Sequence, residues 1–363
     1  MDYRIKLGND GCTFQVAFNR QMCHISYAFF SHKSGAFTMN KHGLYACLLL
    51  PVAALANDST GFVGTGGVQY LHNPHIAMES EDLYISKQQI RVAYRFRNLT
   101  ERNITETVLF PMPRIDSYYD YDFADVAAFE RSFRIWADGK PVVPQAHVRG
   151  WMYPSLPAGG LDYDKPVDMT DALKQCGLSD AELMTPFTRK HDSRRIMQKI
   201  IACENPALRQ LHPQPNAENS IWSAQIIYSW QQTFAANSIT AIRHQYTPLV
   251  GGSLYFDATP SPDNDFYRQY CIDDAFRRQM AQSKQQYLTH QALSYILTTG
   301  ANWAQPIGTF TLTLERDAGE LMSLCWDAPL RRIGPTRFQS VIHNFTPRQD
   351  LNIVFAPGIT LPR

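Results

Sequence analysis

The sequence predicts a mainly β fold: an antiparallel β-sandwich with a small helical insertion, followed by a second β-rich part with one covering helix. The first observation is the run Ile90–Asn98, in which apolar and cationic residues alternate with the period of a half-buried strand. Similar strand-like runs flank it at Leu83–Ser86 and Ile104–Pro111, separated by short polar turns. The chain also has 18 Tyr, 20 Phe and 22 Pro residues, which suits many short strands joined by turns.

Length, hydrophobic content and net charge limit the classes of protein to which this chain can belong. The 363 residues are 44% hydrophobic, which is enough for a sizeable core and for two domains. We expect a β-sandwich domain over 57–252 and a helix plus β-rich domain over 253–363. The formal net charge is +1 and the sequence pI is about 7.7. This balance gives no electrostatic case for nucleic acid, whose binding needs clustered Lys and Arg, so nucleic acid is not an expected partner.

Residues 39–56 have the order of a secretory signal peptide. A basic start at Lys41 and His42 precedes an apolar run over 44–55, and small residues stand at Ala54 and Ala56. Cleavage is expected between Ala56 and Asn57. The run is too short for a permanent membrane span, and no later run is long enough. The alternatives are a buried helix or a membrane anchor. The expected location is periplasmic or secreted.

Residues 1–38 do not fit in front of a signal peptide, because they would bury its charged start. Their pattern shows no sustained period. We interpret them as translation from an upstream start codon, with Met39 as the true start. A genuine disordered extension is the alternative.

Four cysteines follow the expected cleavage point: Cys176, Cys203, Cys271 and Cys325. In an exported chain they favour disulfides over metal ligands, and none has C-x-x-C spacing. Three connectivities are possible. Order along the chain favours Cys176 with Cys203 and Cys271 with Cys325. A free buried thiol is the alternative for each.

The chain after the third strand-like run alternates loop and strand. Pro111 and Pro113 end that run, because proline cannot donate a backbone hydrogen bond. A further strand is expected over Phe129–Trp136, followed by a tight turn in which Gly139 supplies a positive φ. The Pro- and Gly-rich stretch 150–164 is expected to be a loop.

A helical insertion is expected over about 169–211. Thr170 is expected to cap a helix over Asp171–Gln175, and Ser179 to cap a second over Asp180–Thr185. Ile196, Ile200 and Ile201 then recur on one helix face.

Strand patterns return after the insertion. The runs Ile221–Phe234 and Ser238–Tyr246 are expected to pair as a hairpin, with Trp222, Ile226, Tyr228 and Trp230 on one face. A helix is expected over Asp273–Gln286. Five more strand-like runs complete the chain: Leu293–Thr298, Ile307–Glu315, Leu321–Asp327, Arg337–Phe345 and Leu351–Phe355.

Several ordered stretches resemble the bacterial domain of unknown function 4424 family over essentially the whole of the chain from Asn57. They are Asn57–Ser59, Ser80–Ser86, Val92–Asn98, Phe110–Pro113, Asp138–Val142, Tyr228–Phe234, Tyr246–Ser253, Tyr270–Phe276, Tyr295–Leu312 and Phe345–Leu351. The resemblance implies an exported protein without an assigned activity, and it supplies no catalytic residues. The stretch Val92–Pro113 also resembles the vault protein inter-alpha-trypsin domain, a β-sandwich.

Signals for catalysis and metals are weak. A serine hydrolase elbow, Gly-x-Ser-x-Gly, is absent, since Gly251-Gly-Ser253 lies between expected strands. His72 and His75 are too constrained by Pro74 to predict a zinc site, and a solvated loop is favoured. Four carboxylates could bind calcium, but they lack the EF-hand pattern: Asp116, Asp120, Asp122 and Asp125. We expect no metal and no cofactor.

The most suggestive cluster is aromatic. Its members lie in two expected loops, beside carboxylates: Tyr118, Tyr119, Tyr121, Asp122 and Phe123, then Trp151 and Tyr153. Such rings can stack on sugars or hold a peptide, while the acids accept hydrogen bonds. Alternatively, these loops fold back and cap the open end of the sandwich.

We therefore predict an exported envelope protein with a non-catalytic recognition or structural role, whose partner is an envelope glycan or protein. The competing class is an envelope hydrolase acting on glycan or peptide with carboxylates of the 116–125 loop.

Overall fold

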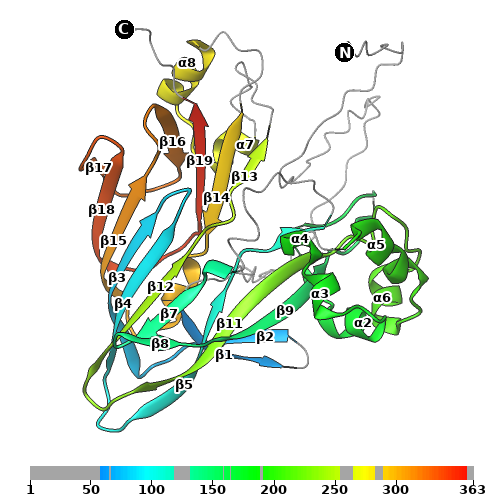
Figure 1. Ribbon diagram of the computed structural model, residues 1–363, viewed down its shortest axis with the longest axis horizontal. Coiled ribbons are helices and arrows are strands. Elements are labelled where there is room, and N and C mark those ends of the chain that lie inside the picture. The colour runs from blue at the N-terminus through cyan, green and yellow to red at the C-terminus, as the bar shows by residue number, and fades with distance from the viewer. Residues whose placement is uncertain are drawn as a thin grey trace, which may run out of the picture. The chain divides into compact units, whose positions relative to one another are not determined.

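β-strands dominate the computed structural model, as the sequence predicted (Figure 1). It describes residues 58–64, 67–117, 131–157, 159–163, 165–188, 191–253, 265–282 and 289–357. The predicted signal peptide, the residues before it, and the aromatic loop at 118–123 lie outside this part of the chain. The strands that are described form three sheets.

The first sheet has seven strands. Its order is β10 (Val167–Asp168), β9 (Gln145–Met152), β11 (Ser223–Phe234), β5 (Ile104–Pro111), β1 (Ser59–Gly64) and β2 (Gly67–Leu71), with β6 (Ile115–Asp116) paired to β11. The second has eight. Its order is β17 (Arg331–Arg332), β18 (Arg337–Phe345), β15 (Ile307–Glu315), β3 (Ile76–Ile85), β4 (Ile90–Asn98), β12 (Ile239–Tyr246), β7 (Arg134–Ala137) and β8 (Lys140–Val142).

The third sheet has four strands. Its order is β13 (Gly251–Ser253), β14 (His290–Tyr295), β19 (Leu351–Pro357) and β16 (Glu320–Leu324). Neighbouring strands in the sheets pair antiparallel, except that β15 runs parallel to β3. This pairing departs from the wholly antiparallel arrangement that the sequence predicted.

The seven-stranded and eight-stranded sheets pack face to face. Phe96 of β4 contacts Phe234 of β11 with ring centroids 5.9 Å apart, and Phe110 of β5 lies 4.8 Å from the ring of His244 on β12. The alternation predicted for β4 is confirmed, because Ile90, Val92, Tyr94 and Phe96 are buried while Arg91 and Arg95 are exposed. The predicted β-sandwich is therefore present.

Two chain segments cross between these sheets at one corner. β4 and β12 pair in the eight-stranded sheet, whereas β5 and β11, which adjoin them in sequence, pair in the seven-stranded sheet. The hairpin predicted between β11 and β12 is therefore wrong. β11 is buried on both faces for most of its length, so it becomes an inner strand between β9 and β5 instead. The buried Asn98 amide holds the corner by donating to the carbonyls of Phe234 and Arg102.

Strands from both sides of residue 253 share the eight-stranded sheet. β15, β17 and β18 extend the sheet beyond β3, although they lie after the boundary that the sequence suggested. The four-stranded sheet also faces the same core, because Leu293, Tyr295, Ile353 and Phe355 pack with the sandwich residues. Independent folding of the two parts stays a prediction.

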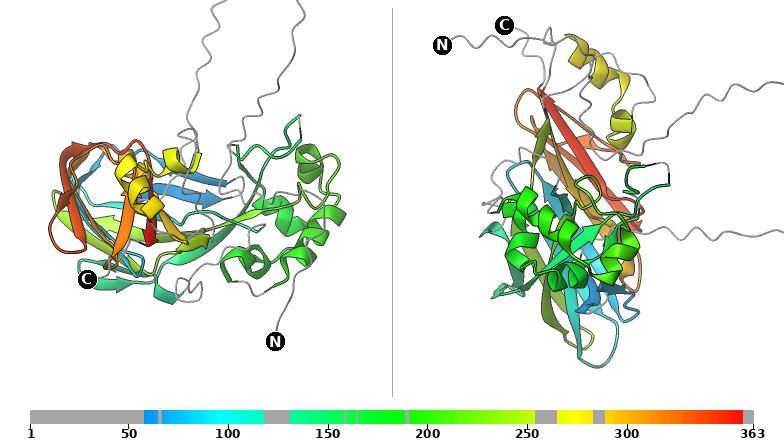
Figure 2. Two further views of the ribbon diagram at one scale, coloured as in Figure 1. Left: turned by 90° about the horizontal axis from the view of Figure 1, so that it is seen from above. Right: turned by 90° about the vertical axis from the view of Figure 1, so that its right-hand side faces the viewer.

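The helical insertion comprises α2 (Thr170–Gln175), α3 (Asp180–Leu183), α4 (Thr185–Thr188), α5 (Ser193–Ala202) and α6 (Pro206–Leu211). These helices gather in one group beside β9 and β11 (Figure 2). The predicted cap Ser179 is confirmed as part of a capping box with Glu182. Cys176 and Cys203 form a disulfide, the favoured pairing.

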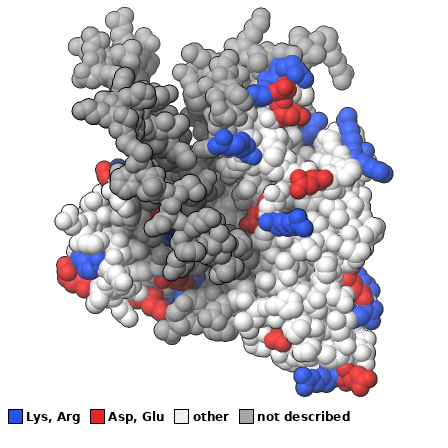
Figure 3. All heavy atoms as spheres, turned by 180° about the vertical axis from the view of Figure 1, so that it is seen from behind, with Lys and Arg blue, Asp and Glu red and all other residues white. Residues whose placement is uncertain are grey.

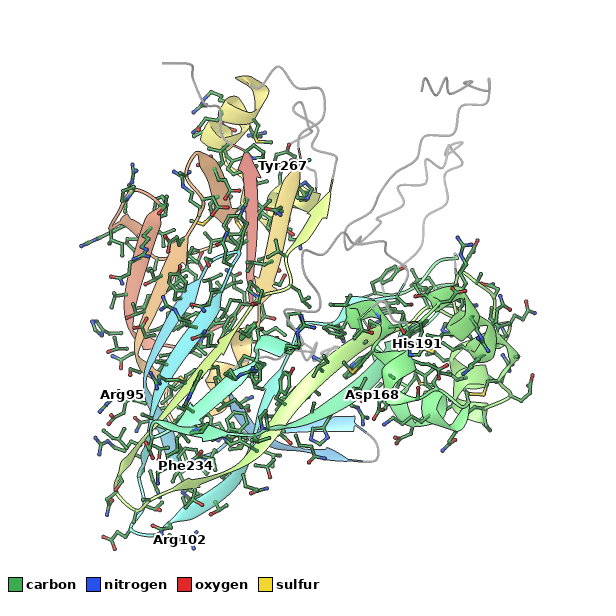
Figure 4. The ribbon with its side chains drawn as sticks, in the orientation of Figure 1. Arg95, Arg102, Asp168, His191, Phe234 and Tyr267 are labelled. Atoms are coloured by element: carbon green, nitrogen blue, oxygen red, sulfur yellow. A yellow bond between two sulfur atoms is a disulfide. The ribbon has the colours of Figure 1, made fainter. Side chains whose placement is uncertain are left out.

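The predicted cap Thr170 is wrong. Thr170 is the first residue of α2, and the carboxylate of Asp168 accepts hydrogen bonds from its backbone N–H and hydroxyl. The same carboxylate accepts two hydrogen bonds from Arg149, at 2.7 and 2.9 Å, where the insertion meets β9 (Figure 4). Met169 is the N-cap residue and supplies no side-chain hydrogen bond, while the Thr170 hydroxyl accepts a hydrogen bond from the backbone N–H of Gly150.

Helices α7 (Asp265–Gln269) and α8 (Asp274–Gln282) cover the outer face of the four-stranded sheet, and η1 (Thr298–Asn302) contacts β1 and β2. Ala292, Val354 and Ala356 alternate with the core-facing residues of β14 and β19 and pack against Phe276 and Met280. The second favoured disulfide, Cys271–Cys325, joins this helical segment to the end of β16.

Gly308 allows the parallel pairing of β15 with β3. A Cβ atom at this position would lie 2.5 Å from the backbone oxygen of Glu79, beside the irregularity between Met78 and Ser80. We expect Gly308→Ala to lower the free energy of unfolding by about 2–3 kcal/mol, because backbone atoms must move. Urea unfolding measures the change. Gly334→Ala is the control, since the nearest atom to its Cβ is 3.7 Å away; equal effects of the two substitutions would contradict the prediction.

Candidate functional site

A buried histidine–carboxylate pair lies between the two sheets of the sandwich. The Nε2 atom of His244 is 2.9 and 3.1 Å from the two carboxylate oxygens of Asp58, and neither side chain is exposed to solvent. β12 places His244 on its inward face, in alternation with Ile242 and Tyr246. Asp58 precedes β1, and its backbone carbonyl accepts a hydrogen bond of 2.8 Å from the indole of Trp303.

Aromatic rings enclose the imidazole. Phe110 and Phe133 stack on it, with centroids at 4.8 and 5.7 Å, and Trp230 and Tyr94 meet it edge-on at 5.4 and 5.6 Å. In this apolar surrounding, burial raises the pKa of the Asp58 carboxyl, and the adjacent imidazole opposes the rise. These surrounding rings therefore separate the pair from solvent.

A second polar group lies in the same core. The hydroxyls of Tyr94 and Tyr295 are 3.2 Å apart and join the eight-stranded sheet to the four-stranded sheet. Burial raises the pKa of both phenols well above the usual value, and the charge of the fully buried Glu81 acts in the same direction. Both tyrosines are neutral hydrogen-bonding groups at physiological pH.

A carboxylate beside an imidazole is the arrangement that orients a general base in hydrolases. Here no substrate atom could reach it, because Asp58, Glu81 and His244 are at most 1% exposed. The cluster therefore connects three sheets and does not form an open catalytic centre. The sequence analysis did not predict this cluster. His244 nevertheless falls on the same strand face as Thr240, Ile242 and Tyr246, a period-two pattern that indicates an inward-facing histidine.

The predicted aromatic contact residues separate in the structure. Trp151 lies in β9, half-buried, with the guanidinium of Arg114 5.2 Å from its ring centroid. Tyr153 is only 5% exposed, packs against Leu161 and Ile221, and donates to Ser223. Trp151 therefore remains accessible, while Tyr153 serves the core. Tyr118, Tyr119, Tyr121 and Asp122 lie outside the described residues.

The segment 150–164 is shorter as a loop than the sequence predicted, since β9 continues to Met152 and pairs with β10 and β11. Its Gly and Pro content is typical of a loop. Gly150 is instead a strand residue whose missing side chain leaves room for Leu173 and Leu183 of the helical insertion.

The structure also shows where some of the weaker catalytic and metal-binding candidates lie. Asp116 lies in β6 and pairs with Ser223 of β11, while the other acids of the predicted calcium loop lie outside the described residues. His72 and His75 are exposed around a turn in which the side chain of Asn73 accepts two backbone N–H groups. Within the described residues, no three His, Cys, Asp or Glu side chains are grouped to hold a metal ion.

Ser253 ends β13, which pairs antiparallel with β14, so this serine does not stand on a strand-to-helix elbow. Charged side chains of both signs are scattered over the face in Figure 3. In the part of the chain that the structure describes, no helix is long and apolar enough to span a bilayer.

Fold and core together define a class: a disulfide-bonded β-sandwich protein whose titratable cluster is enclosed in the core. The family model for the domain of unknown function 4424 matches residues 56–354, and the chain belongs to this family. The similarity of Val92–Pro113 to the vault protein inter-alpha-trypsin domain stays a prediction. Comparison with curated proteins gives no match.

Solved structures resemble the chain only distantly. A proposed nutrient binding protein from Legionella pneumophila is 14% identical with a TM-score of 0.40, over 83% of this chain and 70% of that one. An M1 zinc metallopeptidase from Deinococcus radiodurans is 9% identical with a TM-score of 0.25, over 79% and 43%. Yeast LTA4 hydrolase is 10% identical with a TM-score of 0.27, over 81% and 31%. These similarities are too low to support a functional argument.

Proposed function

We propose that this chain is an exported protein of the bacterial cell envelope, periplasmic or secreted, that acts by binding and not by catalysis. Both disulfides support export, because such bonds form and persist in oxidising compartments. The predicted signal peptide at 39–56 is the corresponding export signal.

The observation that carries the binding role is the enclosure of the Asp58–His244 pair. Asp58 and His244 form a carboxylate–imidazole pair in the described residues, and rings separate it from solvent on several sides. A catalytic group needs contact with its substrate. The accessible groups instead include cations and rings, such as Arg114 over Trp151, which suit recognition.

The proposed contact surface is Trp151, together with the loop that carries Tyr118, Tyr119, Tyr121 and Asp122. This loop follows Ser117, whose backbone N–H donates to the carbonyl of Trp222 at the start of β11. β6 and β9 flank that same end of β11, where Asp116 and Trp151 both pair with Ser223.

Thermal unfolding of the purified protein against envelope glycans, peptidoglycan fragments and peptides tests the proposal. A ligand at 100 times its dissociation constant adds about 2.7 kcal/mol, which raises the midpoint by a few degrees. We expect Trp151→Ala to abolish that rise and Trp151→Phe to retain most of it, because the ring supplies the contact area. Leu99→Ala, a change at another partly exposed apolar side chain, is the control.

Two results would contradict the proposal. If the ligand raises the unfolding midpoint of Trp151→Ala as much as that of the unmodified protein, Trp151 is not part of the contact surface. Turnover of any glycan or peptide in the panel would favour the envelope hydrolase, with its carboxylates in the 116–125 loop.

A further inference from the structure

The outer face of the eight-stranded sheet carries a group of exposed arginines, here called the arginine face: Arg91 and Arg95 of β4, Arg243 of β12 and Arg134 of β7. These strands are neighbours, in the order β4, β12, β7. The inward residues between them form the core, so the guanidinium groups lie on the opposite side. Figure 4 shows Arg95 outside the sandwich and Phe234 inside it.

The register fixes their spacing. Arg243 pairs with Ala93, midway between Arg91 and Arg95, and Gln245 pairs with both Arg91 and Arg134. With about 3.3 Å per residue and about 4.8 Å between strands, neighbouring arginine Cα atoms lie roughly 8–10 Å apart. The cations thus repeat along and across the strands.

These charges are not neutralised by ion pairs. No carboxylate of the described residues forms a salt bridge with any of the four arginines, whereas Arg97, on the same face, pairs with Glu79 and Arg337 pairs with Glu315. Two acids lie beside the group: Asp82 of β3 stands opposite Ala93 in register and interacts with Arg91, and Asp138 accepts a hydrogen bond from the backbone N–H of Ala241, which pairs with Arg95. The excess of positive charge therefore lies on the β4, β12 and β7 side.

Flat and small residues separate the cations. The Arg91 guanidinium lies 4.3 Å from the ring centroid of Tyr84, and that of Arg243 lies 5.6 Å from the ring centroid of Trp136. Ala93 and Ala241 occupy the rows between the arginines. The cations and the rings therefore form one continuous surface, in which Arg91 lies over Tyr84 and Arg243 over Trp136.

We infer that the arginine face binds an acidic polysaccharide. The chemistry of such a chain matches the surface, because carboxylates along the polymer meet the repeated guanidinium groups while sugar rings lie against Trp136 and Tyr84. A polymer engages several arginines at once and gains affinity by multivalency, which a single anion does not. The inference rests on the proposed binding function and names the partner class for a second surface.

The test uses polygalacturonate as the acidic probe and the protein produced from the full coding sequence. We expect the triple variant Arg91→Gln, Arg95→Gln and Arg243→Gln to weaken binding, measured by titration calorimetry, at least about tenfold. The control removes the same charge from exposed positions on helices, with Arg194→Gln, Arg195→Gln and Arg278→Gln, and is expected to change affinity less than about twofold. Neutral dextran is expected not to bind.

Four results would overturn the inference: equal losses in the two triple variants, no binding of polygalacturonate by the unmodified protein, equally tight binding of single-stranded DNA, or preferential binding to acidic phospholipid vesicles. Galacturonate monomer is expected to bind far more weakly than the polymer. Failure here is distinct from failure of the proposed function, which depends on the panel measured with Trp151→Ala.

Discussion

Replacing His244 with alanine is expected to lower the free energy of unfolding by about 3–5 kcal/mol at pH 8, because Asp58 then loses a buried hydrogen bond of 2.9 Å and the core loses a ring. The stacked rings of Phe110 and Phe133 also lose their neighbour. Urea unfolding of the purified protein measures the change. His343→Ala, on the exposed face of β18, is the matched control and is expected to cost under about 0.5 kcal/mol.

The cost of His244→Ala is expected to depend on pH. Burial raises the folded-state pKa of Asp58 above its ordinary value of 3.8, and loss of the imidazole removes the group that opposes this rise. An acid with a raised folded pKa binds its proton more tightly in the folded state. The contribution of Asp58 to the stability of the variant is therefore fully present below pH 3.8 and is lost as pH rises through its folded pKa.

Asp58→Asn separates charge from shape. The amide retains hydrogen bonding to His244 but does not ionise. We therefore expect the stability of Asp58→Asn to lack the pH dependence that is expected for His244→Ala. A pH-independent loss in His244→Ala, or a loss no larger than that of His343→Ala, would show that the ion pair contributes no more than its packing.

The sequence predicted individual strands well, because their alternation records which face meets the core. β4, β15 and β18 begin and end at the predicted residues, and both disulfide pairings are as favoured. The turn at Asp138 and Gly139 has the positive φ values that its residues suggested. These features depend on local chemistry that neighbouring residues specify.

The arrangement of strands in sheets was less predictable. The short link between β11 and β12 suits a hairpin, but the buried Asn98 amide and the pairing of β5 with β11 direct the two strands into different sheets. The parallel pairing of β15 with β3 joins segments more than 200 residues apart. Nothing local to either segment encodes such contacts.

The core cluster was also not predictable in full. His244 shares a strand face with Ile242 and Tyr246, which indicates that its side chain points into the core. Its partner Asp58, however, lies before the first strand, in a polar stretch without period. Likewise, Trp151 and Tyr153 look equivalent in the sequence, yet only Tyr153 is enclosed, by Leu161 and Ile221. Exposure of a ring depends on contacts distant in the chain.

Removal of either disulfide is expected to destabilise the fold strongly. Cys271→Ser with Cys325→Ser opens a link across 54 residues, and the loop-closure entropy of that link corresponds to a loss of about 4 kcal/mol in the free energy of unfolding. Cys176→Ser with Cys203→Ser opens a link across 27 residues, for which the expected loss is about 3.5 kcal/mol. One bond packs in the cluster of the helical insertion and the other joins the α7–α8 segment to the end of β16, so their effects are expected to add. Urea unfolding of each double variant, with and without reductant, measures the losses.

The sum of these losses is comparable with the whole stability of many domains, which is about 5–15 kcal/mol. We therefore expect the protein to fold poorly in a reducing cytoplasm and to accumulate only when it is exported, which soluble yields with and without residues 39–56 would check. Reductant should lower the unfolding midpoint of the unmodified protein and leave a variant lacking all four cysteines unchanged. If reductant leaves the unmodified protein equally stable, the disulfides do not tie this fold to an oxidising compartment, and the proposal of export loses its structural support.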